Sequence, residues 1–327
     1  AQAGDADLAA TLQARLAARP GQPDGTRWFI TDLRQDGDHA VAAAYRSKSV
    51  LLRPTGGQVV LAQRSGDGWQ VVLAGDAGFA ELLAQTPDAL LDPSDRAWIA
   101  ATIPAARPAA AAALAGYRLP WPAGQNAHVT QNYSEHGTGQ IDFWLLGDDI
   151  AAAKAGEIVY INDSHTLRGC SLDFARYNNV IVIRHAADEY SIYAHVATGS
   201  VPTWIKAAYA AQGTVPVTQG TRIARQGNVG FTCGGDGIHL HLSTTGGFSV
   251  WSAPDSQDED GDGNRDEPVQ TAWGSLHQEV DFAEVTYAAL TTWPYEMLLT
   301  SQNNDRACSD AVSSGVALFA APNCHGD

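Results

Sequence analysis

Two histidines separated by one residue give the clearest chemical signal in this 327-residue sequence. The segment GIHLHLST contains His239 and His241, and residues two apart on an extended strand project from the same face. Neutral imidazole is a leading zinc ligand, and a rigid strand holds two rings at a fixed separation. The spacing indicates a metal site on a strand, while a purely structural role for the two histidines is the alternative.

A histidine and a carboxylate upstream can complete such a site. The segment EHGTGQIDFW places His136 on a glycine-rich loop and Asp142 at the start of an apolar strand. A catalytic zinc commonly has three protein ligands and one water, so His136, Asp142 and one of the paired histidines would form such a set. His195, at the end of the strand-like run SIYAHV, supplies another imidazole.

The order of these motifs resembles that of the lysostaphin or LytM-type zinc endopeptidases. It consists of an early His and Asp, a middle YAHV and a late HLH. The similarity covers residues 121–247 and includes TQNYSEHGTGQIDFW, AAKAGEIVYIND, NNVIVIRH and VTQGTRIARQGNVG. With two expected pairs of cysteines in the same half, the chain looks most similar to the β-lytic and staphylolysin-like branch.

The resemblance implies that His136, Asp142 and His241 bind Zn²⁺ and that His195 and His239 transfer protons beside it. It also implies a bacteriolytic metalloprotease that hydrolyses Gly-Gly, Ala-Gly or D-Ala-containing links of cell-wall peptidoglycan, or other Gly- and Ala-rich peptides. On this basis we expect an active hydrolase.

Some residues depart from the family pattern. The separation of six between His136 and Asp142 is longer than in the LytM branch and shorter than in the β-lytic branch. His128 is therefore a rival ligand, although it precedes the strand-like VTQNY and does not lie on the glycine loop. Asn132 and Tyr133 are candidates for orienting substrate or polarising the oxyanion, and ordinary strand roles are the alternative.

Two other functions fit parts of the sequence. SEHGTGQID is similar, with one residue fewer, to the SxHxxGxxxD pattern of D-alanyl-D-alanine carboxypeptidases. That family needs a glutamate base, and Asp236 stands where the glutamate belongs. The second is a catalytically silent lysostaphin-like domain that binds peptidoglycan or regulates a partner. Binding alone gives no reason to retain three metal ligands and two adjacent imidazoles.

An acidic loop at residues 255–267 indicates a second metal. QDEDGDGNRDE fits D-x-D-x-D-G-x-x-D, in which alternate carboxylates converge on one cation and glycine makes the turn. Hard oxygen ligands in a flexible loop suit Ca²⁺, and a solvated acidic loop is the alternative. The predicted ligands are Asp258, Asp260, Asp262, Asn264 and Asp266.

The four cysteines favour disulfide bonds. Cys170, Cys233, Cys308 and Cys324 form no CxxC pair, and four cysteines allow three connectivities. Cys308 and Cys324 are close enough in sequence to staple the C-terminal tail. Disulfides indicate an oxidising compartment, so we expect a secreted or periplasmic protein. The opening AQAGDADLAA lacks signal-peptide features, and we expect a signal peptide already removed.

Charge and hydropathy exclude some partners. The formal charge is −16, with most of the acidic excess after residue 115, so a basic groove for nucleic acid is not expected. No apolar run approaches the roughly 20 residues of a membrane-spanning helix. We expect a monomer.

The remaining pattern predicts two domains. Residues 1–103 contain a helix at 6–18, with leucines four apart, then strand-like segments separated by QDGD, PTGG and SGDG, then two short helices. We expect a small α+β domain there, acting as a propeptide or in wall binding. A Pro/Ala-rich linker is predicted at 104–125. Residues 126–327 are predicted as the mainly β, antiparallel peptidase domain of the lysostaphin type, with a duplicated hybrid motif.

Overall fold

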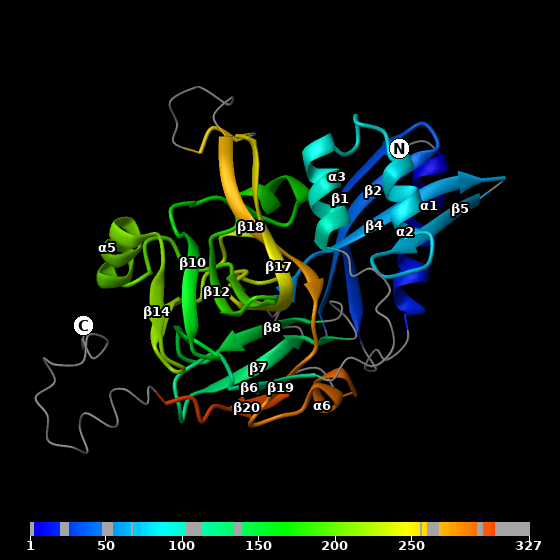
Figure 1. The fold of residues 1–327 in the computed structure, drawn as a ribbon. Coiled ribbons are helices and arrows are strands. Elements are labelled where there is room, and N and C mark those ends of the chain that lie inside the picture. Colours follow the sequence, from blue (N-terminus) through cyan, green and yellow to red (C-terminus); the bar gives the residue numbers. More distant parts are fainter. Residues whose placement is uncertain are drawn as a thin grey trace, which may run out of the picture.

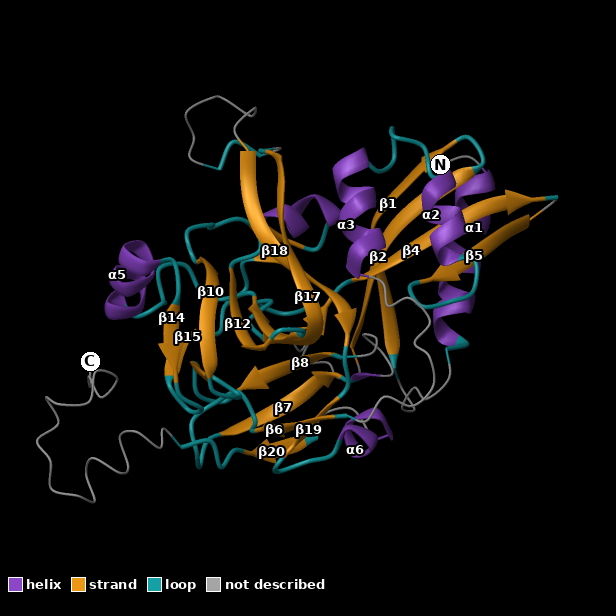
Figure 2. Ribbon diagram, in the orientation of Figure 1, coloured by secondary structure: helices purple, strands orange, loops and turns teal. Residues whose placement is uncertain are grey.

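Strands dominate the computed structural model, and two sheet-based units lie beside each other (Figure 1). The structure describes residues 3–19, 26–47, 55–66, 68–102, 113–133, 139–255, 257–259, 268–292 and 297–304. Antiparallel pairing prevails in the larger sheets, which confirms the predicted mainly β class. Figure 2 shows that most of the helix belongs to the first unit.

The N-terminal unit is an antiparallel meander with helices on both faces. Its described sheet has the order β1-β2-β4-β5. The elements are α1 (Ala3–Ala17), β1 (Arg27–Asp36), β2 (His39–Ser47), β3 (Thr55–Gly56), β4 (Gln58–Ser65), β5 (Gly68–Leu73), α2 (Phe79–Gln85) and α3 (Pro93–Thr102). These bounds agree with the predicted helices, and the strand expected at 49–53 lies outside the described residues.

Side-chain alternation explains how the two faces of this sheet are covered. On β2, the even-numbered residues Ala40, Ala42 and Ala44 pack with Leu8, Leu12 and Leu16 of α1. The odd-numbered residues of the same strand face the helices α2 and α3. Successive strand residues point to opposite faces, so one strand serves both layers. The leucines four apart on α1 form the single stripe that its sequence predicted.

The second unit is built on a larger sheet. Within the described residues its order is β14-β10-β12-β13-β17-β8-β7-β20, and β18 also pairs with β17. Its first elements are β6 (Leu114–Tyr117), β7 (Asn126–Gln131), β8 (Gln140–Leu145), β9 (Asp149–Ala151), β10 (Gly156–Asn162), β11 (Arg168–Gly169), η1 (Leu172–Tyr177), β12 (Val180–Ala186) and β13 (Glu189–Ala194). They are followed by α5 (Thr203–Gln212), β14 (Val215–Val217), β15 (Arg222–Arg225), β16 (Gly230–Cys233), β17 (Leu240–Pro254), β18 (Pro268–His277), β19 (Val280–Phe282), α6 (Tyr287–Thr292) and β20 (Leu298–Thr300).

Part of the predicted linker packs within the second unit. Residues 103–112 lie outside the described part of the chain, but 113–125 pack within the second unit. Strand β6 pairs in parallel with β19, and Tyr117, Leu119 and Trp121 are fully buried in its main core. Their spacing of two is a strand-like alternation among proline, alanine and glycine. The division of the chain into domains at this linker stays a prediction.

Apolar side chains from both units form one shared core. Leu90 and Trp98 of the N-terminal unit cluster with Leu172 and Phe231 of the second. The ring of Trp98 also lies 4.8 Å from that of Trp273 on β18. In Figure 1 helix α3 stands beside the long β17–β18 hairpin. The N-terminal unit is therefore docked on the second one by buried contacts.

Polar groups reinforce this docking. Arg176 of η1 is 3% exposed and donates hydrogen bonds to Asp95 (2.9 Å) and Asp92 (2.8 Å) of the α3 region. Arg34 of β1 donates to Asp173 (2.8 Å). An arginine can serve two carboxylates through its several N–H groups, which makes it suited to an interface between two units.

None of the helices in the described part of the chain has the length and apolar character needed to cross a membrane.

Candidate metallopeptidase site

Four of the predicted site residues meet at the centre of the large sheet. The register places His241 of β17 between Ala194 of β13 and Asp142 of β8. His195 directly follows Ala194, and His239 lies just before β17. Neighbouring strands bring directly opposed Cβ atoms to about 4.5–5.5 Å, so sheet pairing alone gathers residues nearly 100 positions apart.

Distances show how closely these side chains approach. Nδ1 of His241 lies 2.9 Å from Oδ1 of Asp142, and Nε2 of His239 lies 3.7 Å from the other carboxylate oxygen, Oδ2. The ring of His195 lies 4.6 Å from that of His239 and 6.0 Å from that of His241, centroid to centroid. One carboxylate and three imidazoles thus form a single group.

Backbone carbonyls orient two of the imidazoles in the same way. His195 donates from Nδ1 to the carbonyl oxygen of Val229 (2.9 Å), and His239 donates from Nδ1 to that of Gly237 (2.9 Å). A carbonyl only accepts, so each Nδ1 carries a proton and each neutral ring keeps Nε2 as its basic nitrogen. Sequence patterns alone did not identify these carbonyls.

His241 is oriented differently. Its Nε2 lies 2.8 Å from Oγ of Ser243, which directs Nδ1 to Asp142. Hydrogen bonding of the distal nitrogen is the usual way in which a protein fixes a metal-binding imidazole. Ser243 was not predicted as a site residue, although its spacing of two from His241 puts it on the same strand face.

The site is closed to solvent in this structure. Asp142 and His239 are 0% exposed, His195 is 5% exposed and His241 is 7% exposed. Burial lowers the pKa of His195 well below its usual value, and the neighbouring His239 and His241 lower it further. The His195 imidazole is therefore held neutral, the form that accepts a proton.

The backbone of His195 is also unusual. Its φ angle is 60°, in the left-handed region that residues with a Cβ rarely adopt. Such conformations cost energy and cluster at functional sites. The strained residue is the one whose imidazole packs against that of His239.

The described residues fit part of a zinc site. A nitrogen and an oxygen 2.9 Å apart can both bind one ion at about 2 Å, as His241 and Asp142 are placed to do. His136, the predicted third ligand, lies outside the described residues. Within the part that is described, no group of three or more His, Cys, Asp or Glu is arranged to hold an ion. The complete ligand set stays a prediction.

His128, the rival ligand, is placed elsewhere. It lies on β7 opposite Trp144, and the two rings stack at a centroid distance of 5.7 Å. The strand partner of Asp142 is Gln131, three residues further along β7, or roughly 10 Å at the rise of a strand. The described structure does not bring His128 to the histidine group.

The predicted substrate residues lie at the end of β7. Asn132 and Tyr133 are 6% and 3% exposed. The Tyr133 ring packs 4.6 Å from that of Tyr287 in the main core, and burial raises its pKa well above the usual value. Their predicted contact with substrate stays a prediction.

Of the predicted calcium ligands, only Asp258 is described. Asp260, Asp262, Asn264 and Asp266 lie outside the described residues. The base of the loop is firmly tied, because Glu259 accepts hydrogen bonds from the Thr166 backbone and pairs with His165 at 2.6 Å. Calcium binding therefore stays a prediction.

One predicted disulfide is present. Cys170 and Cys233 are bonded, joining the start of η1 to β16 across 63 residues of sequence. Sequence alone left three connectivities open, and the register that places β11 beside β16 decides this pair. Cys308 and Cys324 lie outside the described residues.

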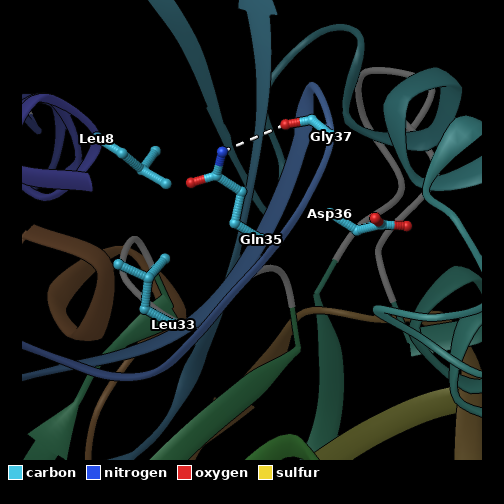
Figure 3. A pocket seen from close by; sticks show the side chains of 5 residues that line it. All are labelled: Leu8, Leu33, Gln35, Asp36 and Gly37. Atoms are coloured by element: carbon cyan, nitrogen blue, oxygen red, sulfur yellow. Dashed lines mark hydrogen bonds between the residues drawn. The ribbon is translucent and has the colours of Figure 1, made fainter. Parts of the chain in front are cut away.

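A separate hollow lies on the N-terminal unit. It has a volume of about 480 Å³ and is lined, among the described residues, by Leu8, Leu33, Gln35, Asp36 and Gly37. Figure 3 shows Gln35 directed across it, with its amide donating to the Gly37 carbonyl at 3.2 Å. It contains none of the residues predicted to do chemistry.

Comparisons with known proteins give distant structural matches. The sequence matches no protein-family model and no curated protein. Among solved structures, the SpoIIQ–SpoIIIAH pore-forming complex aligns with a TM-score of 0.24 and 18% identity over 36% of this chain and 64% of that chain. A second SpoIIIAH–SpoIIQ complex aligns with a TM-score of 0.24 and 20% identity over 37% and 71%.

A peptidase domain is also among these matches. A catalytic-domain mutant of the prophage-encoded M23 protein EnpA from Enterococcus faecalis aligns with a TM-score of 0.25 and 18% identity, over 42% of this chain and 87% of that chain. At such TM-scores, the chemistry of this chain has to be inferred from its own residues.

Proposed function

We propose that this chain is a zinc-dependent endopeptidase of the lysostaphin type that hydrolyses peptide links of bacterial peptidoglycan outside the cytoplasm. One observation carries the proposal. Nδ1 of His241 and Oδ1 of Asp142 lie 2.9 Å apart, and the imidazoles of His195 and His239 lie next to this pair. The Cys170–Cys233 disulfide supports an oxidising compartment.

The zinc would be held by Asp142, Nδ1 of His241 and His136, and when bound it would activate a water molecule and polarise the scissile carbonyl. Ser243 would keep the His241 ring in its ligating orientation. An aspartate–histidine pair buried in an apolar sheet is costly unless its charge is neutralised, which a divalent cation would do.

His195 and His239 would perform the proton transfers. Each presents Nε2 as a base because its Nδ1–H is bonded to a backbone carbonyl. One imidazole accepts a proton from the attacking water, and an imidazolium formed in this way can donate to the departing amine. Positioned proton transfer of this kind contributes about 10²–10⁴-fold to a rate.

The experiment is digestion of purified peptidoglycan of the glycine-bridged and the directly cross-linked type, with released fragments identified by mass spectrometry. New N-termini that disappear with a zinc chelator are the expected result. His195→Ala should abolish them. His185→Ala is the matched control, because His185 is also a hydrogen-bonded histidine but contacts Ala155 and Ser191 outside the group.

Several outcomes would count against the proposal. Fragment release that persists in the presence of the chelator would contradict a role for the metal in hydrolysis. Failure of both the intact chain and the chain cleaved between residues 103 and 112 to release any fragment would remove the wall hydrolase function. Binding to peptidoglycan without cleavage would favour the silent binding domain.

A further inference from the structure

The N-terminal unit places a short strand on the sheet that borders the candidate site. Strand β3 pairs antiparallel with β16, with Gly56 opposite Thr232 and Thr55 opposite Cys233. On its other edge β16 pairs with β11. In the intact chain, one edge of β16 is therefore occupied by backbone from the N-terminal unit.

This edge is continuous with the backbone that holds both imidazoles. The Val229 carbonyl, which accepts from His195, immediately precedes β16. Two residues earlier, the Gly227 carbonyl accepts from the backbone N–H of His239 at 2.9 Å. An extended chain that continued along β16 toward Val229 would therefore approach the candidate catalytic groups.

Phe231 leaves space only for glycine on the paired chain. A Cβ built on Gly57 would lie 2.0 Å from Cζ of Phe231, and within 2.7 Å of both Cε atoms. Gly57 is not among the glycines with positive φ, so its backbone does not require glycine. The aromatic ring imposes that requirement.

The Phe231 ring has little freedom to retreat. It is 7% exposed and belongs to the core shared by the two units. Its backbone N–H donates to Oδ1 of Asn178 at 3.2 Å, and Cys233 two residues on is fixed by the disulfide. A methyl group opposite the ring would therefore displace the added strand and leave the ring in place.

We propose that the edge of β16 opposite β11 is the docking site for an extended glycine-containing peptide, that Phe231 selects glycine there, and that residues 55–57 occupy this edge in the intact chain. Addition of a peptide strand to a sheet edge is a general recognition mode in which backbone hydrogen bonds give affinity and local pockets give specificity. The inference rests on the proposed endopeptidase function for the identity of its substrate.

The first measurement uses the unaltered full-length chain treated with chelator. Excess pentaglycine peptide should replace β3, so hydrogen exchange of the Gly56 and Gly57 amides should rise while exchange in β16 stays slow. A peptide of equal length with a central alanine should have no such effect. Equal responses to the two peptides, or no response to either, would contradict the docking site.

The second measurement uses the full-length variant Gly57→Leu, in which β3 can no longer lie against Phe231. Its affinity for pentaglycine should be about tenfold or more above that of the unaltered chain, because the internal competitor is removed. Gly68→Leu is the matched control, since Gly68 lies in the same unit with open space around it. Unchanged pentaglycine affinity in Gly57→Leu would overturn the occupation of this edge by β3.

The selectivity of Phe231 for glycine is tested in the Gly57→Leu variant. Gly57→Leu should bind the alanine peptide about 10-fold or more weaker than pentaglycine, and Gly57→Leu with Phe231→Ala should lose that preference. A preference that persists without the ring would refute Phe231 as the selecting residue. Because binding is measured in chelator, a failure to hydrolyse walls would remove the proposed function and leave these readouts intact.

Discussion

The two units bury different kinds of side chain. The core between α1 and the N-terminal sheet consists of leucine, alanine, valine and tryptophan. At the centre of the second sheet lie Asp142, His195 and His239, each at most 5% exposed. Buried titratable groups cost stability unless they are paired, so their grouping at the centre of the second sheet indicates a constraint other than packing, whereas the α1 core is explained by packing alone.

The largest effect should come from the histidine group. His239→Ala should lower turnover about 10²–10⁴-fold and keep the zinc content, because this imidazole is proposed to move protons. His241→Ala should lose both zinc and activity. Zinc measured by elemental analysis, together with rates on the same wall substrate, separates the two roles. Unchanged zinc content in His241→Ala would overturn the ligand assignment.

The second largest effect should come from removal of the disulfide, and it should appear in the free energy of unfolding. Its two cysteines are separated by 63 residues, for which the chain-entropy relation gives about 4 kcal/mol. Cys170→Ser combined with Cys233→Ser should lower the free energy of unfolding by an amount of this order. Denaturant titration followed by tryptophan fluorescence measures it. A loss below about 1 kcal/mol would show that η1 and β16 are held together without the bond.

In the N-terminal unit, the largest single-residue effect should come from its packed helix. Leu12 is 1% exposed, and Leu12→Ala should cost about 2–5 kcal/mol by loss of contacts and formation of a cavity. Leu33→Ala is the control, because Leu33 is 39% exposed and should cost little. Equal losses in the two variants would show that the α1 stripe is not a tight core.

The histidine group was predictable because its signal is local. A spacing of two on a strand fixes a common face, and the apolar residues around HLH predict a buried strand. The leucines of α1 were predictable for the same reason. The pairing of the strands could not be predicted in this way, because register depends on contacts between distant segments. The resemblance implied that Asp142 and His241 bind one ion, but the register that sets them opposite each other was not predicted.

Other features had no usable local signal. The pairing of β3 with β16 joins two segments more than 170 residues apart through four backbone residues, too few to produce a pattern. The carbonyls of Val229 and Gly237 carry no side-chain identity. Arg176 looks in sequence like any surface arginine, yet it is buried and donates hydrogen bonds to Asp92 and Asp95 of the α3 region.

The smallest predicted effect concerns this docking and its dependence on pH. Burial and the nearby Asp92 together raise the pKa of Asp95 to about 7, against the opposing effect of Arg176. Hydrogen bonds from Ser94, the Asp95 backbone and Arg176 outweigh burial and hold the pKa of Asp92 well below its usual value. The two carboxylates thus share one guanidinium, and Asp95 is the one disfavoured in its charged form.

The sign of the effect follows from the raised pKa. Asp95 contributes stability that is fully present below its unfolded pKa of about 3.9 and is lost as the pH rises through about 7. Asp95→Asn should therefore flatten the fall in Tm between pH 5 and pH 8 by roughly 2–4 °C, measured by calorimetry. Asp88→Asn, at a side chain 70% exposed, should keep the slope of the unaltered chain. If Asp95→Asn keeps that slope as well, Asp95 is ionised throughout this range and Arg176 outweighs its burial.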